Sequence, residues 1–118
     1  FRGFGPALEA MRYPAPGAPD LAEDVLRRLR EAGFAATSDA ERGYDHGTWI
    51  PLACMYPDAD LPVLQMSVCP TRSPRHHWRM GRALAGLAAE GVLVIGSGAL
   101  THNLADWRAR RGTPQAEA

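Results

Sequence analysis

The sequence has little that would place it among disulfide-stabilised, membrane-spanning or nucleic-acid-binding proteins. Its 118 residues include only two cysteines, Cys54 and Cys69, which lack the CxxC spacing of a zinc knuckle. We therefore expect two reduced, buried thiols in a cytoplasmic protein. The longest apolar runs are far shorter than the about 20 residues that cross a bilayer. Thirteen basic residues balance thirteen acidic ones, so no net field attracts nucleic acid or an anionic membrane surface.

Metal-binding motifs are also missing. The four histidines form no HxH, HxxxH or HxxE pattern. His76 and His77 are adjacent in a predicted helix, where neighbouring side chains point in different directions, so a solvated helix start is favoured over a shared metal. The length and the 46% hydrophobic content indicate one globular domain, or a large piece of one.

Two helices are indicated by their end signals. In the first, Asp20 is the predicted N-cap, with Glu23 at the spacing of a capping box, and Gly33 ends the helix. In the second, Ser73 is the predicted N-cap, Pro74 takes the first helical position, and Gly91 follows the end. The predicted buried stripes are Leu21, Val25, Leu26 and Leu29 in the first helix, and Met80, Leu84, Leu87 and Ala88 in the second.

Two segments read as strands. Residues 61–68 alternate between the two faces of a strand, with Pro62 near the start, where a missing donor is tolerated. Residues 92–95 are continuously apolar, which is typical of a strand buried on both faces of a parallel sheet. A short helical turn is expected over residues 48–55 and a further helix over residues 102–110. This order predicts an α/β fold, with a mainly parallel central sheet flanked by helices and a domain that is only partial.

The first candidate site follows the predicted strand at residues 92–95. Ligands of open α/β sheets bind beyond the carboxyl ends of the strands, and Gly96-Ser97-Gly98, followed by His102, takes that position. The alternative is a turn whose histidine caps the next helix. A dinucleotide site is disfavoured because Thr101 stands where GxGxxG requires its last glycine.

The second candidate is Asp45-His46-Gly47-Thr48-Trp49. A loop histidine between an acidic residue and a glycine can be oriented by its neighbour and still reach a ligand. The alternative is an exposed loop histidine without a role. Trp49 and Tyr56 are expected to be core aromatics rather than a substrate cage.

Taken together, several segments resemble the class III extradiol ring-cleavage dioxygenases of the LigB type, especially the 4,5-DOPA dioxygenase branch. They occur in the family's order and cover nearly the whole chain. The segments are Arg12-Tyr13-Pro14-Ala15-Pro16-Gly17, Tyr44-Asp45-His46-Gly47-Thr48-Trp49, Met55-Tyr56-Pro57, Asp60-Leu61-Pro62-Val63, Gln65-Met66-Ser67, Gly81-Arg82-Ala83-Leu84, Gly96-Ser97-Gly98 and His102-Asn103-Leu104.

The resemblance implies a non-haem Fe(II) enzyme, with zinc able to occupy the site in purified members. Such an enzyme binds a catechol through its two hydroxyl oxygens and cleaves the ring beside the diol with O2, giving a semialdehyde. His102 matches the histidine that handles protons, and the family leaves open that this residue is itself a metal ligand. His46 matches a second active-site histidine, which is expected to contact the substrate.

The family's other metal ligands lie outside the matched segments. We therefore expect residues 1–118 to be a partial catalytic domain that lacks N- and C-terminal segments and is inactive on its own. The competing hypothesis is a non-catalytic α/β binding module that kept the scaffold without the metal site. A nucleotide-binding enzyme is the weakest alternative, because it rests only on Gly96-Ser97-Gly98.

Overall fold

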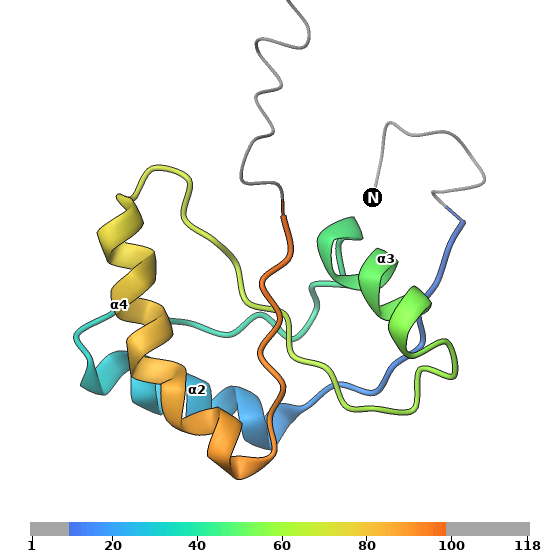
Figure 1. Ribbon diagram of the computed structural model, residues 1–118, viewed down its shortest axis with the longest axis horizontal. Helices are drawn as coiled ribbons and strands as arrows, with labels where there is room; N and C mark the ends of the chain where they lie inside the picture. The colour runs from blue at the N-terminus through green and yellow to red at the C-terminus, as the bar shows by residue number, and fades with distance from the viewer. Residues whose placement is uncertain (1–9, 99–118) are drawn as a thin grey trace, which may run out of the picture.

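The computed structural model describes residues 10–98, which contain three α-helices and one 3-10 helix. These elements are α2 (Pro19–Glu31), α3 (His46–Met55), α4 (Pro74–Leu84) and η1 (Ala85–Glu90). Helices α2 and α4 pack against each other, and α3 lies across the extended chain from them (Figure 1). In this part of the chain no helix has the length and apolar character needed to cross a membrane.

Helix α2 begins earlier than its capping signal predicts. Pro19 occupies the first turn and Ala18 is the N-cap, so Asp20 is the acidic residue of the first turn rather than the cap. The prediction of Asp20 as N-cap is therefore wrong. Proline already has helical φ and needs no donor at this position, so it extends the helix by one residue beyond the carboxylate. Gly33 ends the helix as predicted, at φ +83°.

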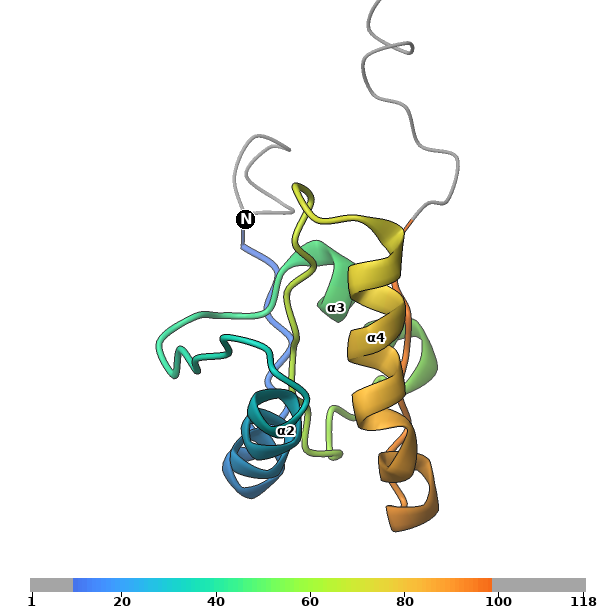
Figure 2. The ribbon, with the colours of Figure 1, turned by 90° about the vertical axis from the view of Figure 1, so that its left-hand side faces the viewer.

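Helix α4 confirms both of its predicted start signals. Ser73 is the N-cap, its hydroxyl oxygen accepts from the His76 N–H at 3.4 Å, and Pro74 opens the helix. The chain continues directly into η1, so that α4 and η1 form one continuous column (Figure 2). Gly91 ends the column at φ +83°, a conformation that glycine adopts without strain.

The core lies between α2 and the column of α4 and η1. Its buried members come from the predicted stripes, which confirms the helical faces. They are Val25 and Leu29 from α2, Met80 and Leu84 from α4, and Leu87 from η1. Phe34, Leu64 and Val92 pack against this cluster from the connecting segments. Of the other residues in the predicted stripes, Leu21 and Leu26 are half-buried and Ala88 is exposed.

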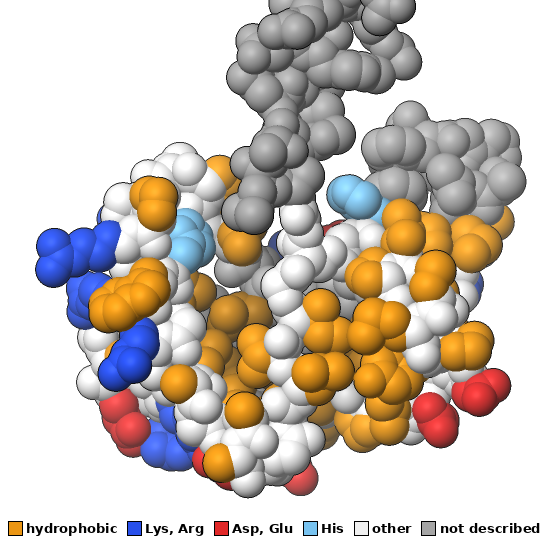
Figure 3. Space-filling view, viewed as in Figure 1, with side chains coloured by type: hydrophobic (Ala, Val, Ile, Leu, Met, Phe, Trp, Pro, Cys, Tyr) orange, Lys and Arg blue, Asp and Glu red, His pale blue; other side chains and the backbone are white. Residues whose placement is uncertain are grey.

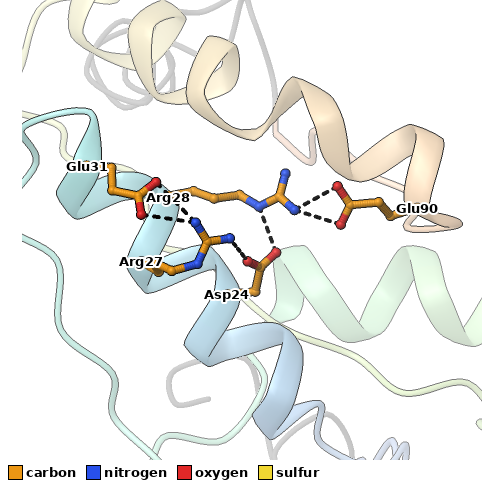
Figure 4. A network of polar contacts seen from close by, with 5 residues as sticks. All are labelled: Asp24, Arg27, Arg28, Glu31 and Glu90. Carbon is orange, nitrogen blue, oxygen red and sulfur yellow. Dashed lines mark hydrogen bonds and ion pairs between the residues drawn. The ribbon is translucent and has the colours of Figure 1, made fainter.

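A polar network closes the same interface (Figure 4). The Arg28 guanidinium of α2 donates to both carboxylate oxygens of Glu90 in η1, at 2.7 and 2.6 Å, and to Asp24 at 2.7 Å. Arg27 hydrogen-bonds to Asp24 and pairs with Glu31 at 3.0 Å. The hydrogen bond from Arg27 contributes most to holding the pKa of Asp24 below its usual value. The network ties the end of η1 to the middle of α2.

The predicted α/β fold is wrong for the described part of the chain, which is helical and has no strand or sheet. Its nearest approach to a sheet is one isolated parallel bridge between Gly17 and Val63. There the Val63 N–H donates to the Pro16 carbonyl at 2.9 Å. Apart from this bridge at Val63, residues 61–68 have no strand partner among residues 10–98.

The predicted central strand at residues 92–95 is also wrong. Leu93 and Val94 are 64% and 61% exposed, and Ile95 is 41% exposed. Only Val92 packs against the core. A continuous apolar run is buried only when strands and layers from elsewhere cover both of its faces. That cover is a long-range property, and within residues 10–98 nothing supplies it.

The predictions for the aromatic and cysteine side chains can also be compared with the structure. Trp49 is buried as expected, and Tyr56 is half-buried. The expectation of buried thiols is wrong, because Cys54 and Cys69 are both free and exposed. The predicted helix at residues 102–110 lies outside the described residues.

Candidate functional site

His46 lies at the start of α3, where it is the first helical residue and is exposed. Asp45 is the N-cap, with extended backbone at φ −85° and ψ 173°. The Asp45 carbonyl accepts from the N–H groups of Thr48 and Trp49, at 3.0 and 2.9 Å. The helix predicted to begin at residue 48 thus starts two residues earlier, and His46 belongs to its rigid first turn rather than to a loop.

Gln65 fixes this first turn from a distant segment. Its Oε1 accepts from the Asp45 N–H at 2.8 Å and from the Thr48 hydroxyl at 2.7 Å. Both contacts are partly buried. No role was predicted for Gln65. A polar residue within the strand-like run at residues 61–68 is, however, a sequence signal for a specific polar contact. Among the described residues α3 packs against no other helix, and these polar contacts tie its first turn to residue 65.

The two candidate motifs meet at Gly47. A Cβ built on Gly47 would lie 3.6 Å from the Ser97 hydroxyl oxygen and 3.2 Å from Asp45 Oδ1. A larger residue would crowd this junction. Gly98, with φ +142°, has a backbone conformation that favours glycine. The structure therefore places Gly96-Ser97-Gly98 against the turn that carries His46, whereas His102 lies outside the described residues.

Two tyrosines hold the chain on either side of α3. The Tyr44 hydroxyl donates to the Val63 carbonyl at 3.0 Å, and the Tyr13 hydroxyl donates to the Tyr56 carbonyl at 2.8 Å. Burial, followed by the nearby Tyr13, raises the pKa of Tyr44. Burial, followed by Asp60 and Tyr56, raises the pKa of Tyr13. Both phenols therefore stay protonated at neutral pH and act as structural donors.

One ion pair borders the site. An Arg42 guanidinium nitrogen lies 3.6 Å from Asp45 Oδ2, with both side chains about half exposed. An exposed pair at this distance contributes little to stability because water and salt screen it. Arg42 does, however, keep a positive charge beside the turn that carries His46.

The described residues do not fit a metal ion. Residues 10–98 bring no three histidine, cysteine, aspartate or glutamate side chains close enough to hold one. His77 is fully used in a structural role: one ring nitrogen accepts from the Cys69 N–H at 3.0 Å and the other lies 3.1 Å from the Ser73 carbonyl.

Comparison with known proteins identifies the family. The family model for the catalytic LigB subunit of aromatic ring-opening dioxygenase matches residues 1–118. The chain belongs to the LigB family. This confirms the family resemblance drawn from the sequence.

Individual proteins with related sequences support the same family assignment. The chain is 50% identical over 103 residues to a 4,5-DOPA dioxygenase extradiol of Beta vulgaris, covering 86% of this chain and 38% of the relative. It is 54% identical over 93 residues to that of Portulaca grandiflora, covering 78% and 34%. It is 45% identical over 105 residues to that of Escherichia coli (strain K12), covering 88% and 38%. The chain thus spans little more than a third of the length of these relatives.

Proposed function

We propose that this chain is part of an extradiol dioxygenase that opens a catechol ring with O2 and yields a semialdehyde. The observation that carries the proposal is the contact between Gly47 and Ser97, in a chain that matches the LigB family along its whole length. That contact joins the two histidine-bearing motifs. A DOPA-like catechol is the proposed substrate class, because several relatives carry the name 4,5-DOPA dioxygenase extradiol.

The two histidines receive different roles in this proposal. His46 contacts the catechol, in keeping with its exposed position on a rigid helix start. His102 transfers protons, a task that suits imidazole because it exchanges protons near neutral pH. In the sequence His102 closely follows the Gly96-Ser97-Gly98 motif, with three residues between Gly98 and His102.

The metal is proposed from the family alone. LigB-type enzymes are expected to use Fe(II), which zinc can replace in purified protein. In this proposal the other metal ligands come from outside residues 1–118, with His102 either beside the metal or bound to it. A cytoplasmic location belongs to the same proposal, because the two cysteines are free thiols.

A chimera tests the proposed function. The matching segment of the Escherichia coli relative, which aligns over 105 residues, is replaced by this chain. The chimera should cleave DOPA with O2, followed by the absorbance of the semialdehyde product. His102→Ala should reduce kcat by about 10²–10⁴-fold while much of the iron stays bound. His46→Ala should mainly raise KM, and Thr37→Ala, in an exposed loop, should change neither constant.

The outcomes of the chimera experiment separate the hypotheses. A chimera that binds iron at the level of the parent but cleaves no catechol would support the non-catalytic module. Loss of iron in His102→Ala would make this residue a ligand rather than a proton-transfer group. Full turnover in both histidine variants would show that the assigned roles are wrong.

The 118-residue chain alone provides a second test. We expect weak Fe(II) binding and no ring cleavage, because a facial metal site needs three protein ligands. Isothermal titration under anaerobic conditions measures the binding, and oxygen uptake measures turnover. Stoichiometric, tight iron binding with catechol cleavage would refute the assignment of the other metal ligands outside residues 1–118.

A further inference from the structure

The charges of the chain are unevenly distributed. No acidic residue occurs between Asp60 and Glu90, and the same stretch carries Arg72, Arg75, Arg79 and Arg82. These arginines lie in the turn before α4 and along α4 itself. The space-filling view shows basic side chains gathered over this side of the molecule (Figure 3). A chain with zero net charge therefore presents a locally cationic surface.

Part of this surface is hollowed. An open depression of about 510 Å³ is lined by Thr71, Arg72, Ser73, Arg75, His76 and Arg79. Three of the six side chains are arginines, and no carboxylate lines the depression. Within residues 10–98 the salt bridges of arginine involve Arg27, Arg28 and Arg42, and none involves the three lining arginines.

The rim of the depression is held in place. His77 bonds to the Cys69 N–H and lies 3.1 Å from the Ser73 carbonyl, which fixes the turn that carries Thr71 and Arg72. The Arg79 guanidinium stacks over the Phe34 ring, 5.5 Å from its centroid. Stacking limits the freedom of a guanidinium, so less entropy is lost when it binds a ligand.

We propose that this depression binds a phosphate group. A guanidinium presents a planar fork of donors that matches two oxygens of a phosphate, and three such forks suit an anion of charge −2 or more better than a single carboxylate. The hydroxyls of Thr71 and Ser73 supply further donors at the rim. This inference does not depend on the proposed dioxygenase function.

His76 also lines the depression, so its protonation responds to the same basic groups. Its pKa is lowered first by burial and then by the charges of His77, Arg72 and Arg79. Those are the charged or titratable groups that act on it, and all of them are basic. A bound phosphate would offset this field, so the pKa of His76 should rise on binding.

The direct experiment titrates the full chain with pyrophosphate and with inorganic phosphate at constant ionic strength. We expect saturable binding with pyrophosphate tighter, and at most weak competition by acetate. Arg75→Gln and Arg79→Gln should each weaken binding about tenfold or more, because a hydrogen bond to a charged group is lost. The matched control is Arg82→Gln. It removes the same charge from the same helix, but Arg82 stacks on Trp78, 5.8 Å from the ring centroid, and does not line the depression.

Further measurements test the role of His76, the source of the phosphate and the need for a guanidinium group. The NMR titration of the His76 ring should show a higher pKa with pyrophosphate present and in Arg79→Gln. Vesicles of phosphatidylcholine with phosphatidic acid test whether the phosphate is borne by a lipid. Sedimentation with these vesicles that pyrophosphate competes away assigns a headgroup, and binding of pyrophosphate alone assigns a soluble ligand. Arg79→Lys, which keeps the charge without the fork, should recover only part of the affinity.

Three results would overturn the proposal. The first is no saturation with either phosphate. The second is an equal loss of binding in Arg82→Gln, which indicates unspecific attraction to the cationic surface. The third is acetate competing as well as phosphate. Circular dichroism of each variant verifies its fold, and these exposed positions tolerate glutamine without loss of the core.

Discussion

Replacing Gln65 with Leu removes the single oxygen that holds the start of α3. Oε1 accepts from the Asp45 N–H at 2.8 Å and from the Thr48 hydroxyl at 2.7 Å. A typical hydrogen bond contributes about 1 kcal/mol, and a donor left without an acceptor costs about 1–3 kcal/mol. Both donors are only partly buried, so water replaces some of the loss. We expect the free energy of local unfolding of α3 to fall by about 2 kcal/mol.

The effect should be local. No other helix of the described chain packs against α3, whereas α2, α4 and η1 share the core. Hydrogen exchange of the Trp49 amide, which donates to the Asp45 carbonyl at 2.9 Å, is the reporter. A change of about 2 kcal/mol corresponds to exchange about 30-fold faster. Amides of α2 should keep their exchange rates.

Two controls sharpen the Gln65 prediction. Gln65→Glu retains an acceptor oxygen and should change the exchange of α3 far less than Gln65→Leu does. Met66→Leu alters the exposed neighbour and should have no effect on α3. If Gln65→Leu leaves the Trp49 amide within about threefold of wild type, the polar contacts do not hold α3. Equal acceleration in α2 would show that the helices open as one unit.

Three further predictions concern the helical core and its charges. Leu87→Ala, at a side chain only 3% exposed, should cost about 2–5 kcal/mol in urea unfolding, whereas Leu93→Ala, at 64% exposed, should stay within about 0.5 kcal/mol. Burial, followed by neighbouring basic groups, lowers the pKa of His76 from 6.5, so the folded state favours the neutral ring. The stability from this group is present above pH 6.5 and is lost as the pH falls through the lowered value, and His76→Gln should remove that dependence in pH-dependent unfolding. Glu90→Gln removes the negative charge and one of the two oxygens that accept from Arg28, and it should lower Tm and the sensitivity of Tm to NaCl in calorimetry.

The helices were predictable where their signals are local. Ser73, Pro74 and Gly91 act through their own backbone geometry and their nearest neighbours, so the second helix was found with its start and its stop. The first helix shows how two local rules compete. Pro19 and Asp20 are both good start residues, and the proline determined the boundary.

The predictions of two strands were wrong because the signal for a strand is not local. Alternating or continuous apolar residues indicate which side chains of a segment could be buried. Whether they are buried depends on other segments of the chain that cover them. Residues 61–68 make a single bridge, at Val63, and Leu93 and Val94 are exposed. The core needed neither segment as a strand, since it forms from the facing stripes of α2, α4 and η1.

The candidate site shows the same division between local and distant information. The residues around His46 could be selected from the sequence because a histidine between Asp45 and Gly47 can be oriented by its neighbour and still reach a ligand. The contact between Gly47 and Ser97 could not, because fifty residues separate them and no periodicity encodes it. Gln65 joins a third segment to the same turn. Three stretches that resemble the LigB family separately thus converge at the first turn of α3, and this convergence makes His46 a better candidate than an exposed loop histidine would be. Since α3 packs against no other described helix and its first turn is hydrogen-bonded to Gln65, a change in residues 61–68 should reach His46 without disturbing the helical core.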